Sequence, residues 1–185
     1  MHRWRVGTEH EKIGLYEDSL ERVTYEGKRG IGALLEAVRK TGEWEPIMDG
    51  EHLVGLRQGG ASITLEPGGQ IELSGAPLRT ARETCREFNA HVDLLNAVSE
   101  EFGLLWLGIG ADPLHPVSEI PKMPKQRYDI MRAYLPTRGK LGLDMMHATA
   151  TVQANYDYAD EADMAAKMRM AMGVAPLCSA LFANS

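Results

Sequence analysis

The sequence has few of the features that mark several large protein classes. Its 185 residues include only two cysteines, Cys85 and Cys178, which lie far apart and lack the spacing of a zinc site. The cysteine pattern therefore supports neither a zinc knot nor a secreted disulfide scaffold. Each cysteine is expected to be a small buried hydrophobe.

Long apolar runs, basic runs and glycine-rich phosphate loops are also missing. No run approaches the length of a membrane span, and the opening MHRWRVGTEHEK has no apolar signal core, so a cytoplasmic protein is expected. A net charge of −6 argues against nucleic acid. Gly108-Ile109-Gly110 lacks the third glycine of a dinucleotide loop, and none of the six histidines stands in a triad context. The composition, 44% hydrophobic and 25% charged, is typical of one globular domain.

The stretch from Ala61 to Pro77, ASITLEPGGQIELSGAP, predicts a tight hairpin. Aliphatic residues alternate with polar ones on both sides of Pro67-Gly68-Gly69, which suit a turn. The alternation predicts one polar face, formed by Ser62, Thr64, Glu66, Gln70 and Glu72. Two solvated glutamates on an exposed sheet face would explain this pattern, and a cation site is the alternative.

Two other predicted strands carry similar polar faces. The strand from Trp4 to Leu15 places Glu9 and Glu11 on one side. A third strand, from Met145 to Tyr158, alternates small apolar residues with Thr149, Thr151, Gln153, Asn155 and Asp157. That strand is expected either to line a polar ligand or simply to face solvent.

The remaining pattern predicts helices, a second hairpin, an apolar strand and a long loop. The helix from Thr80, whose Glu83 completes a capping box, should bury Ala81, Cys85, Phe88, Val92, Leu95, Val98 and Phe102. The last helix, 160–184, should be interrupted at Pro176 and should bury Met164, Met168, Ala171 and Met172. The other elements are a helix from Arg29 to about Gly42, a hairpin over 44–56, a strand over 104–109 buried on both faces, a loop over 111–124 and a helix over about 126–134.

These elements predict an α+β fold in which one curved antiparallel sheet has helices packed on one face. The three polar strand faces would then line the other, concave face. Carboxylate and amide oxygens suit Mg²⁺, which is normally shared with nucleotide phosphates. Arg127 and Arg132, in the helix over 126–134, are either solvated or directed at a substrate carboxylate or phosphate.

Four long blocks resemble the plant and proteobacterial type of glutamate-cysteine ligase, a relative of the glutamine synthetase superfamily. They are GTEHEKIG at 7–14, GLRQGGASITLEPGGQIELSGAP at 55–77, MPKQRYDIMRAYLP at 123–136 and GLDMMHATATVQANYDY at 142–158. The resemblance implies the curved-sheet fold and an ATP-dependent reaction. Glutamate's γ-carboxylate would be phosphorylated, and the amine of cysteine would displace phosphate to give γ-glutamylcysteine, the first step of glutathione synthesis.

The resemblance also implies roles for individual residues. Glu9, Glu11, Glu66, Glu72 and, with a substituted residue type, Gln153 would hold Mg²⁺, with Mn²⁺ as the alternative ion. Arg127 and Arg132 would be catalytic, Gln153 and Asn155 would contact the cofactor, and Arg132, Met146, Thr149 and Thr151 would bind the amino-acid substrate.

The family's members extend beyond this sequence at both ends, so 1–185 is expected to be a single partial catalytic domain with little ligase activity alone. Its expected partners are glutamate, cysteine and ATP, without nucleic acid or membrane, and the full-length protein is expected to form a homodimer. A plastid location is the alternative for a plant source. Two other functions are kept open: ligation of glutamate to a different amine, and an inactive fragment that serves as a structural partner.

Overall fold

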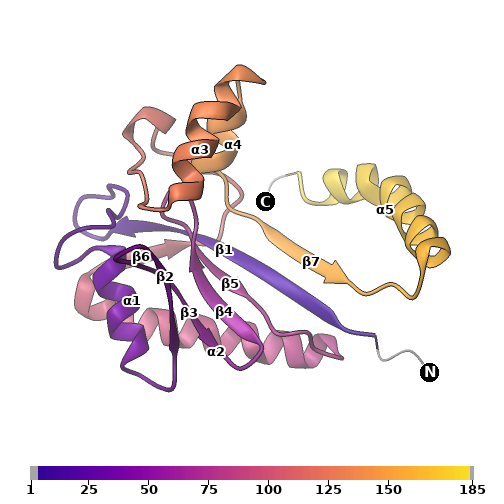
Figure 1. Ribbon diagram of the computed structural model, residues 1–185, viewed down its shortest axis with the longest axis horizontal. Coiled ribbons are helices and arrows are strands. Elements are labelled where there is room, and N and C mark those ends of the chain that lie inside the picture. The colour runs from indigo at the N-terminus through magenta and orange to yellow at the C-terminus, as the bar shows by residue number, and fades with distance from the viewer. Residues whose placement is uncertain (1–3, 184–185) are drawn as a thin grey trace.

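A seven-stranded antiparallel sheet forms the centre of the computed structural model, which describes residues 4–183 (Figure 1). Its strands are β1 (Val6–Tyr16), β2 (Glu45–Asp49), β3 (His52–Gln58), β4 (Ala61–Leu65), β5 (Ile71–Ser74), β6 (Leu104–Leu107) and β7 (Val152–Tyr156). The strand order is β2-β3-β4-β5-β1-β6, and β7 also pairs with β1. The predicted α+β class and antiparallel sheet are confirmed.

Helices α1 (Ile31–Arg39) and α2 (Ala81–Ser99) pack against one face of the sheet (Figure 1). The main core lies between them and the sheet, where Leu34 and Leu35 of α1 and Leu95 of α2 meet Leu56 and Ile63. Burying aliphatic side chains of this size contributes about 1.5–3 kcal/mol each. The helices therefore fix which face of each strand packs in the main core. The opposite face carries polar side chains and, towards the end of β1, a second small core of Ile13, Leu15 and Ala150.

The remaining helices come late in the chain, two between β6 and β7 and one after β7. They are α3 (Gln126–Tyr134), α4 (Gly142–Ala148) and α5 (Glu161–Leu181), with 3₁₀ turns at Glu100–Phe102, Val117–Glu119 and Leu135–Thr137. Figure 1 places α3 and α4 beside each other and α5 beyond β7. The predicted α1, α3 and two N-terminal hairpins are confirmed, as is the capping box of Thr80 and Glu83 on α2.

The third predicted strand was wrong over its first part, because Met145 to Ala148 belong to helix α4. Met146 is buried in the main core and His147 is also buried, so tertiary packing at these positions outweighs the alternating pattern. The strand that follows, β7, is exposed along its whole length. Gln70 was also misplaced: it lies in the turn between β4 and β5 with 1% of its surface exposed, and not on the polar face.

Several burial predictions were wrong as well. Cys85 and Cys178 are both exposed, and the buried ridge of α2 consists of His91, Leu95 and Ser99. Within residues 4–183, β6 pairs with β1 alone, and its Leu105 is exposed, so this strand is not buried on both faces.

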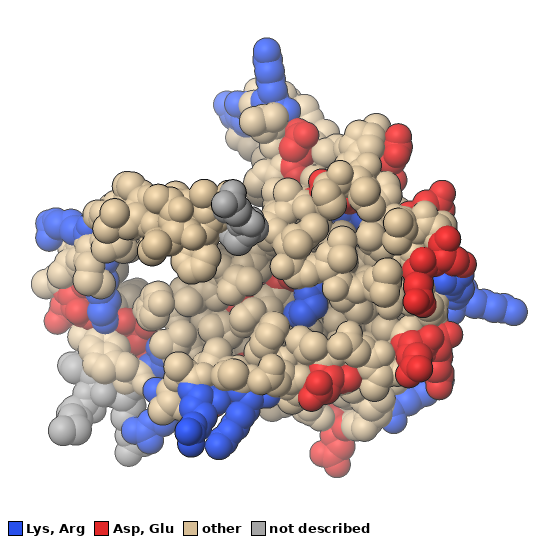
Figure 2. Space-filling view, turned by 180° about the vertical axis from the view of Figure 1, so that it is seen from behind, with Lys and Arg blue, Asp and Glu red and all other residues tan. Residues whose placement is uncertain are grey.

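Helix α5 differs most from its prediction. It continues through Pro176 without interruption, and none of its residues is buried, including the four expected in the core. Figure 2 shows its largely uncharged half as a tan arm with an opening between it and the rest of the molecule. In the N-terminal half of the helix, Lys167 Nζ donates to the Asp157 carbonyl at 2.7 Å and lies over the Trp4 ring.

Candidate metal centre

Three carboxylates converge on the sheet face that α1 and α2 leave uncovered. Glu11 of β1 lies directly opposite Glu72 of β5, and Glu66 follows the last residue of β4. One oxygen from each of the three side chains lies within 4.8 Å of the other two. The two strands and the turn thus bring together residues that are up to 61 positions apart in sequence, and each side chain is half-buried.

Neighbouring hydroxyl and amide groups hold two of these carboxylates in place. The hydroxyl of Thr64 donates to Glu72 Oε1 at 3.2 Å, and the hydroxyl of Ser74 donates to the same oxygen. The backbone N–H of Thr151 donates to Glu11 Oε2 at 2.9 Å. Period-two alternation explains the arrangement, since Thr64 and Ser74 lie on the same face of the sheet as Glu72.

The electrostatics of the cluster favour a cation. Burial, together with the nearby charge of Glu72, raises the pKa of Glu66 to about 7. Burial also raises the pKa of Glu11, although the hydrogen bond from Thr151 opposes the shift. Three carboxylates held together repel one another, and a divalent ion would remove that repulsion.

The donor set fits magnesium. Mg²⁺ binds oxygen ligands at about 2.1 Å, so two ligands on opposite sides of the ion lie about 4.2 Å apart. The three carboxylate oxygens all lie within 4.8 Å of one another, a limit that admits this separation. The all-oxygen ligand set also matches the hard cations Mg²⁺ and Mn²⁺ better than the softer metals that thiolates select.

Glu9 and the predicted amide ligands lie beside this cluster. Glu9 is on the same face of β1 as Glu11 and pairs with Gln153 of β7. Its Oε1 accepts a hydrogen bond from Asn155 Nδ2 at 2.9 Å, while Gln153 Nε2 donates to Thr151 at 2.9 Å. The three-carboxylate group does not include Glu9, which therefore lies at its border.

The two predicted arginines are separated by the structure. Arg127 is exposed and lies near enough to Glu66 for its charge to oppose the rise in the pKa of that carboxyl. Arg132 instead donates to Asp129 at 2.6 Å within α3. Burial lowers the pKa of His147, and the charge of Arg132 adds to that shift. Only Arg127 is thus associated with the carboxylate cluster.

A lysine that the sequence patterns did not single out lies closer to the cluster. Lys125 Nζ donates to the Leu65 carbonyl at 2.6 Å and to the Tyr128 hydroxyl at 3.0 Å. Burial lowers the pKa of Lys125, and the charge of Glu66 opposes that shift. The only signal in the sequence was its place inside the block MPKQRYDIMRAYLP, immediately before α3.

The predicted substrate residues occupy different environments. Met146 is 4% exposed and packs in the main core. The hydroxyl of Thr149 donates to the Met145 carbonyl at 2.7 Å, and Thr151 is exposed next to Glu11. Among them, Thr151 has the direct contact with the carboxylate cluster.

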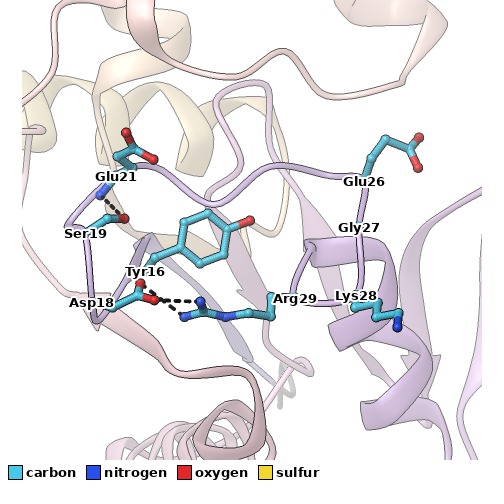
Figure 3. Close-up of a pocket in the computed structure, with 8 residues that line it drawn as sticks. All are labelled: Tyr16, Asp18, Ser19, Glu21, Glu26, Gly27, Lys28 and Arg29. Atoms are coloured by element: carbon cyan, nitrogen blue, oxygen red, sulfur yellow. Dashed lines mark hydrogen bonds and ion pairs between the residues drawn. The ribbon is translucent and has the colours of Figure 1, made fainter.

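A separate surface pocket of about 410 Å³ lies beyond the other end of β1 (Figure 3). Tyr16, Asp18 and Arg29 line it, and Arg29 forms a 2.8 Å ion pair with Asp18 while lying over the Tyr16 ring. Because this guanidinium already has a partner, the carboxylate cluster is the stronger candidate for chemistry.

None of the helices in residues 4–183 is both long enough and apolar enough to cross a lipid bilayer.

The fold and the cluster together define an α+β protein whose antiparallel sheet presents a candidate cation site. The model of glutamate-cysteine ligase family 2 matches residues 5–185, and the chain belongs to that family. It is 50% identical over 183 residues to the chloroplastic glutamate–cysteine ligases of Brassica juncea and Medicago truncatula, covering 99% of this chain and 35% of each relative. The Arabidopsis thaliana enzyme is 50% identical over the same length, of which the match covers 34%. The chain thus spans about a third of the length of the curated relatives it matches.

Proposed function

We propose that this chain forms part of an ATP-dependent ligase that joins glutamate to cysteine. Family membership and the names of the chloroplastic relatives support this proposal. In the proposed reaction, the γ-carboxylate of glutamate attacks the terminal phosphorus of ATP and releases ADP. The cysteine amine then attacks the resulting acyl phosphate, phosphate leaves, and γ-glutamylcysteine forms. The observation that carries the proposal is the convergence of Glu11, Glu66 and Glu72 on one sheet face.

The three clustered carboxylates would hold Mg²⁺, with Glu9 and Gln153 beside them. When bound, the ion would neutralise the charge of the nucleotide phosphates. Glu66 and Glu11 would have to be ionised to serve as ligands, which their raised pKa values disfavour in the metal-free chain. Metal binding and proton release are therefore expected to be coupled.

The cations next to the cluster suit the anionic substrates. Lys125 and Arg127 lie at its edge, where an ammonium and a guanidinium would bind a phosphoryl group or a carboxylate. Phosphoryl transfer depends on such positioning and charge neutralisation, without a covalent protein nucleophile. Arg132, Asn155, Met146, Thr149 and Thr151 remain proposed contacts to the amino acid or the nucleotide, and Thr151 is the one placed directly beside Glu11.

The whole reaction belongs to the longer protein, since the chain spans about a third of its relatives. We expect residues 1–185 to bind Mg²⁺ or Mn²⁺ but to show little turnover alone. The proposed location is the cytoplasm, and the relatives' names add the plastid as the alternative. A homodimer is proposed for the full-length protein, with small molecules and no nucleic acid or membrane as its partners.

Two measurements test the proposal, one on this chain and one on a full-length relative. Binding of Mn²⁺, detected from the electron paramagnetic resonance signal of the free ion, should be saturable in the wild type and weak in Glu11→Gln. ADP release should then be measured in a full-length relative with glutamate and a panel of amines, with and without the substitution equivalent to Glu11→Gln. Loss of glutamate-dependent ADP release in the variant is expected. Unchanged Mn²⁺ binding and unchanged turnover would refute the proposed site, and a preference for another amine would refute cysteine as the acceptor.

A further inference from the structure

A buried ion pair lies behind the turn that carries Glu66. The side chains of Arg22 and Asp112 are 1% and 0% exposed, and Arg22 Nη1 lies 2.8 Å from Asp112 Oδ2. The other guanidinium nitrogen, Nη2, donates to the carbonyl oxygen of Gly68. Arg22 precedes α1 and Asp112 follows β6, so this pair joins two distant loops to the turn.

Asp112 is itself fixed from several sides. Its Oδ1 accepts from the backbone N–H groups of Leu114 at 2.8 Å and His115 at 3.1 Å. Burial opposes its charged form, but the bonds from Arg22, Leu114 and His115 outweigh burial and lower its pKa. The backbone N–H of Asp112 donates to the Ala148 carbonyl at 2.7 Å, which ties the pair to the segment that leads into β7.

Gln70 holds the same turn from its other side. Its Oε1 accepts from the Gly68 N–H at 2.8 Å, and its Nε2 donates to the Thr149 carbonyl at 2.6 Å. There is no room for a larger residue at Gly68, where a Cβ atom would lie 2.1 Å from the His147 carbonyl oxygen. The turn is therefore enclosed by side chains that satisfy its backbone.

We propose that Arg22, Asp112 and Gln70 are positioning residues, which hold Glu66 against Glu11 and Glu72 in the metal centre. This inference rests on the proposed function. The physical reason is that three clustered carboxylates repel one another, so Glu66 would move toward solvent unless its backbone were held. The hold passes through the backbone of the turn, because the three side chains fix Gly68 and Gln70. The Glu66 N–H donates to the Gln70 backbone carbonyl at 2.9 Å, and the Glu66 carbonyl accepts from the Gly69 N–H at 2.9 Å. None of the three positioning side chains belongs to the group of carboxylates that could bind the ion.

The test uses the Mn²⁺ dissociation constant of the folded chain, measured at a temperature where circular dichroism shows no unfolding. In Gln70→Met, the new side chain is neutral and of nearly the same size as glutamine but lacks both of its hydrogen-bonding groups. Arg22→Lys keeps the positive charge but loses the two guanidinium nitrogens that bond to Asp112 and Gly68. Each should weaken Mn²⁺ binding about 10- to 100-fold, as is usual when a partner of a ligand is lost. Gln58→Met, at an exposed position in β3, is the matched control and should bind as the wild type does.

A double-mutant cycle separates positioning from a purely structural role. If Gln70 acts through Glu66, Gln70→Met should change the dissociation constant less than about twofold in a Glu66→Gln background. The inference would be overturned if Gln70→Met lost the same Mn²⁺ affinity in both backgrounds. It would also be overturned if Gln70→Met and Arg22→Lys both kept the wild-type affinity, or if both variants unfolded. Absence of Mn²⁺ binding in the wild type, or wild-type binding in both Glu11→Gln and Glu66→Gln, would instead refute the proposed metal centre, and this inference with it.

Discussion

The two faces of β1 place ionisable residues in opposite situations. On one face, Glu9 and Glu11 join other carboxylates at the candidate metal centre. On the other, His10 and Lys12 lie under α2 against the Phe88 ring. The ring centroids of His10 and Phe88 are 4.5 Å apart, and Lys12 Nζ lies 5.0 Å from the Phe88 centroid. One alternating sequence thus supplies both environments.

The face under α2 disfavours charge. Lys12 is 7% exposed, and its Nζ has no hydrogen-bond partner in the part of the chain that the structure describes. Burial lowers the pKa of Lys12 to about 8 and that of His91, on α2, to about 3. The comparison teaches that burial disfavours positive charge on one face, while negative charge gathers on the other, where a cation can offset it. Four predictions test this difference, from the largest expected effect to the smallest.

Removing one clustered carboxylate should have the largest effect. Glu11→Gln keeps the side chain's size but removes a charged ligand, so the Mn²⁺ dissociation constant should rise about 100-fold. Removing a residue that only supports a ligand usually costs no more than this. Glu9→Gln, at the border of the cluster, should have a smaller effect. Isothermal titration calorimetry would compare them with Glu36→Gln, a surface control on α1. Equal losses in Glu9→Gln and Glu11→Gln would contradict the border position of Glu9.

Glu66→Gln should stabilise the metal-free chain at pH 8. The folded-state pKa of Glu66 is about 7 against an ordinary value of 4.5, so the folded chain holds the proton more tightly. Stability therefore falls as pH rises from about 4.5 to 7, and the cost is fully present above 7. The gain should be roughly 1–3 kcal/mol at pH 8 and should vanish near pH 4, as measured by urea unfolding. A gain that is the same at both pH values would contradict this origin.

Lys12→Met should also stabilise the chain, but with the opposite dependence on pH. The folded-state pKa of Lys12 is about 8 against 10.5, so the folded chain loses its proton more readily. The cost is fully present below about pH 8 and disappears as pH rises to 10.5. Urea unfolding should show a gain of roughly 1–3 kcal/mol at pH 7 that shrinks by pH 10. Mn²⁺ affinity should change less than about threefold, since the ammonium lies on the other face. A large change in affinity would break the separation of the two faces.

The smallest effect is expected at the start of α2. Thr80→Ala removes the hydroxyl that accepts from the Glu83 N–H at 3.2 Å, and loss of such a cap costs about 1 kcal/mol. Thermal unfolding should detect that loss, while Mn²⁺ affinity stays at the wild-type value. Thr80→Ser, which keeps the hydroxyl, is the matched control. A Thr80→Ala variant as stable as the control would show that the capping box contributes nothing measurable.

The elements that could be predicted from sequence are those with local signals. Helix α3 begins and ends at the predicted residues, and the Pro-Gly-Gly hairpin forms as expected. The shared face of Glu9 and Glu11 follows from alternation alone. The pairing of Glu11 with Glu72 depends instead on the register of β1 and β5, which is set by hydrogen bonds between strands far apart in the chain.

The errors arose where a local pattern allowed two outcomes. Met146 fits an alternating strand, yet it packs into the core as part of α4. Pro176 removes one helical hydrogen bond, but the α5 residues around it still continue the helix. Arg22 and Asp112 gave no signal, and Lys125 gave only its place in a family-like block, because the importance of all three comes from contacts with residues more than 40 positions away.

By itself, the sequence determined the α+β class, the polar and apolar faces of the first strands, and the family resemblance that the comparisons confirmed. Tertiary structure alone decided which carboxylates meet, which arginine lies beside them, and what holds the turn of Glu66. The physical reason is that side-chain periodicity is a property of a few neighbouring residues, whereas a site requires strand register and packing among segments separated by most of the chain.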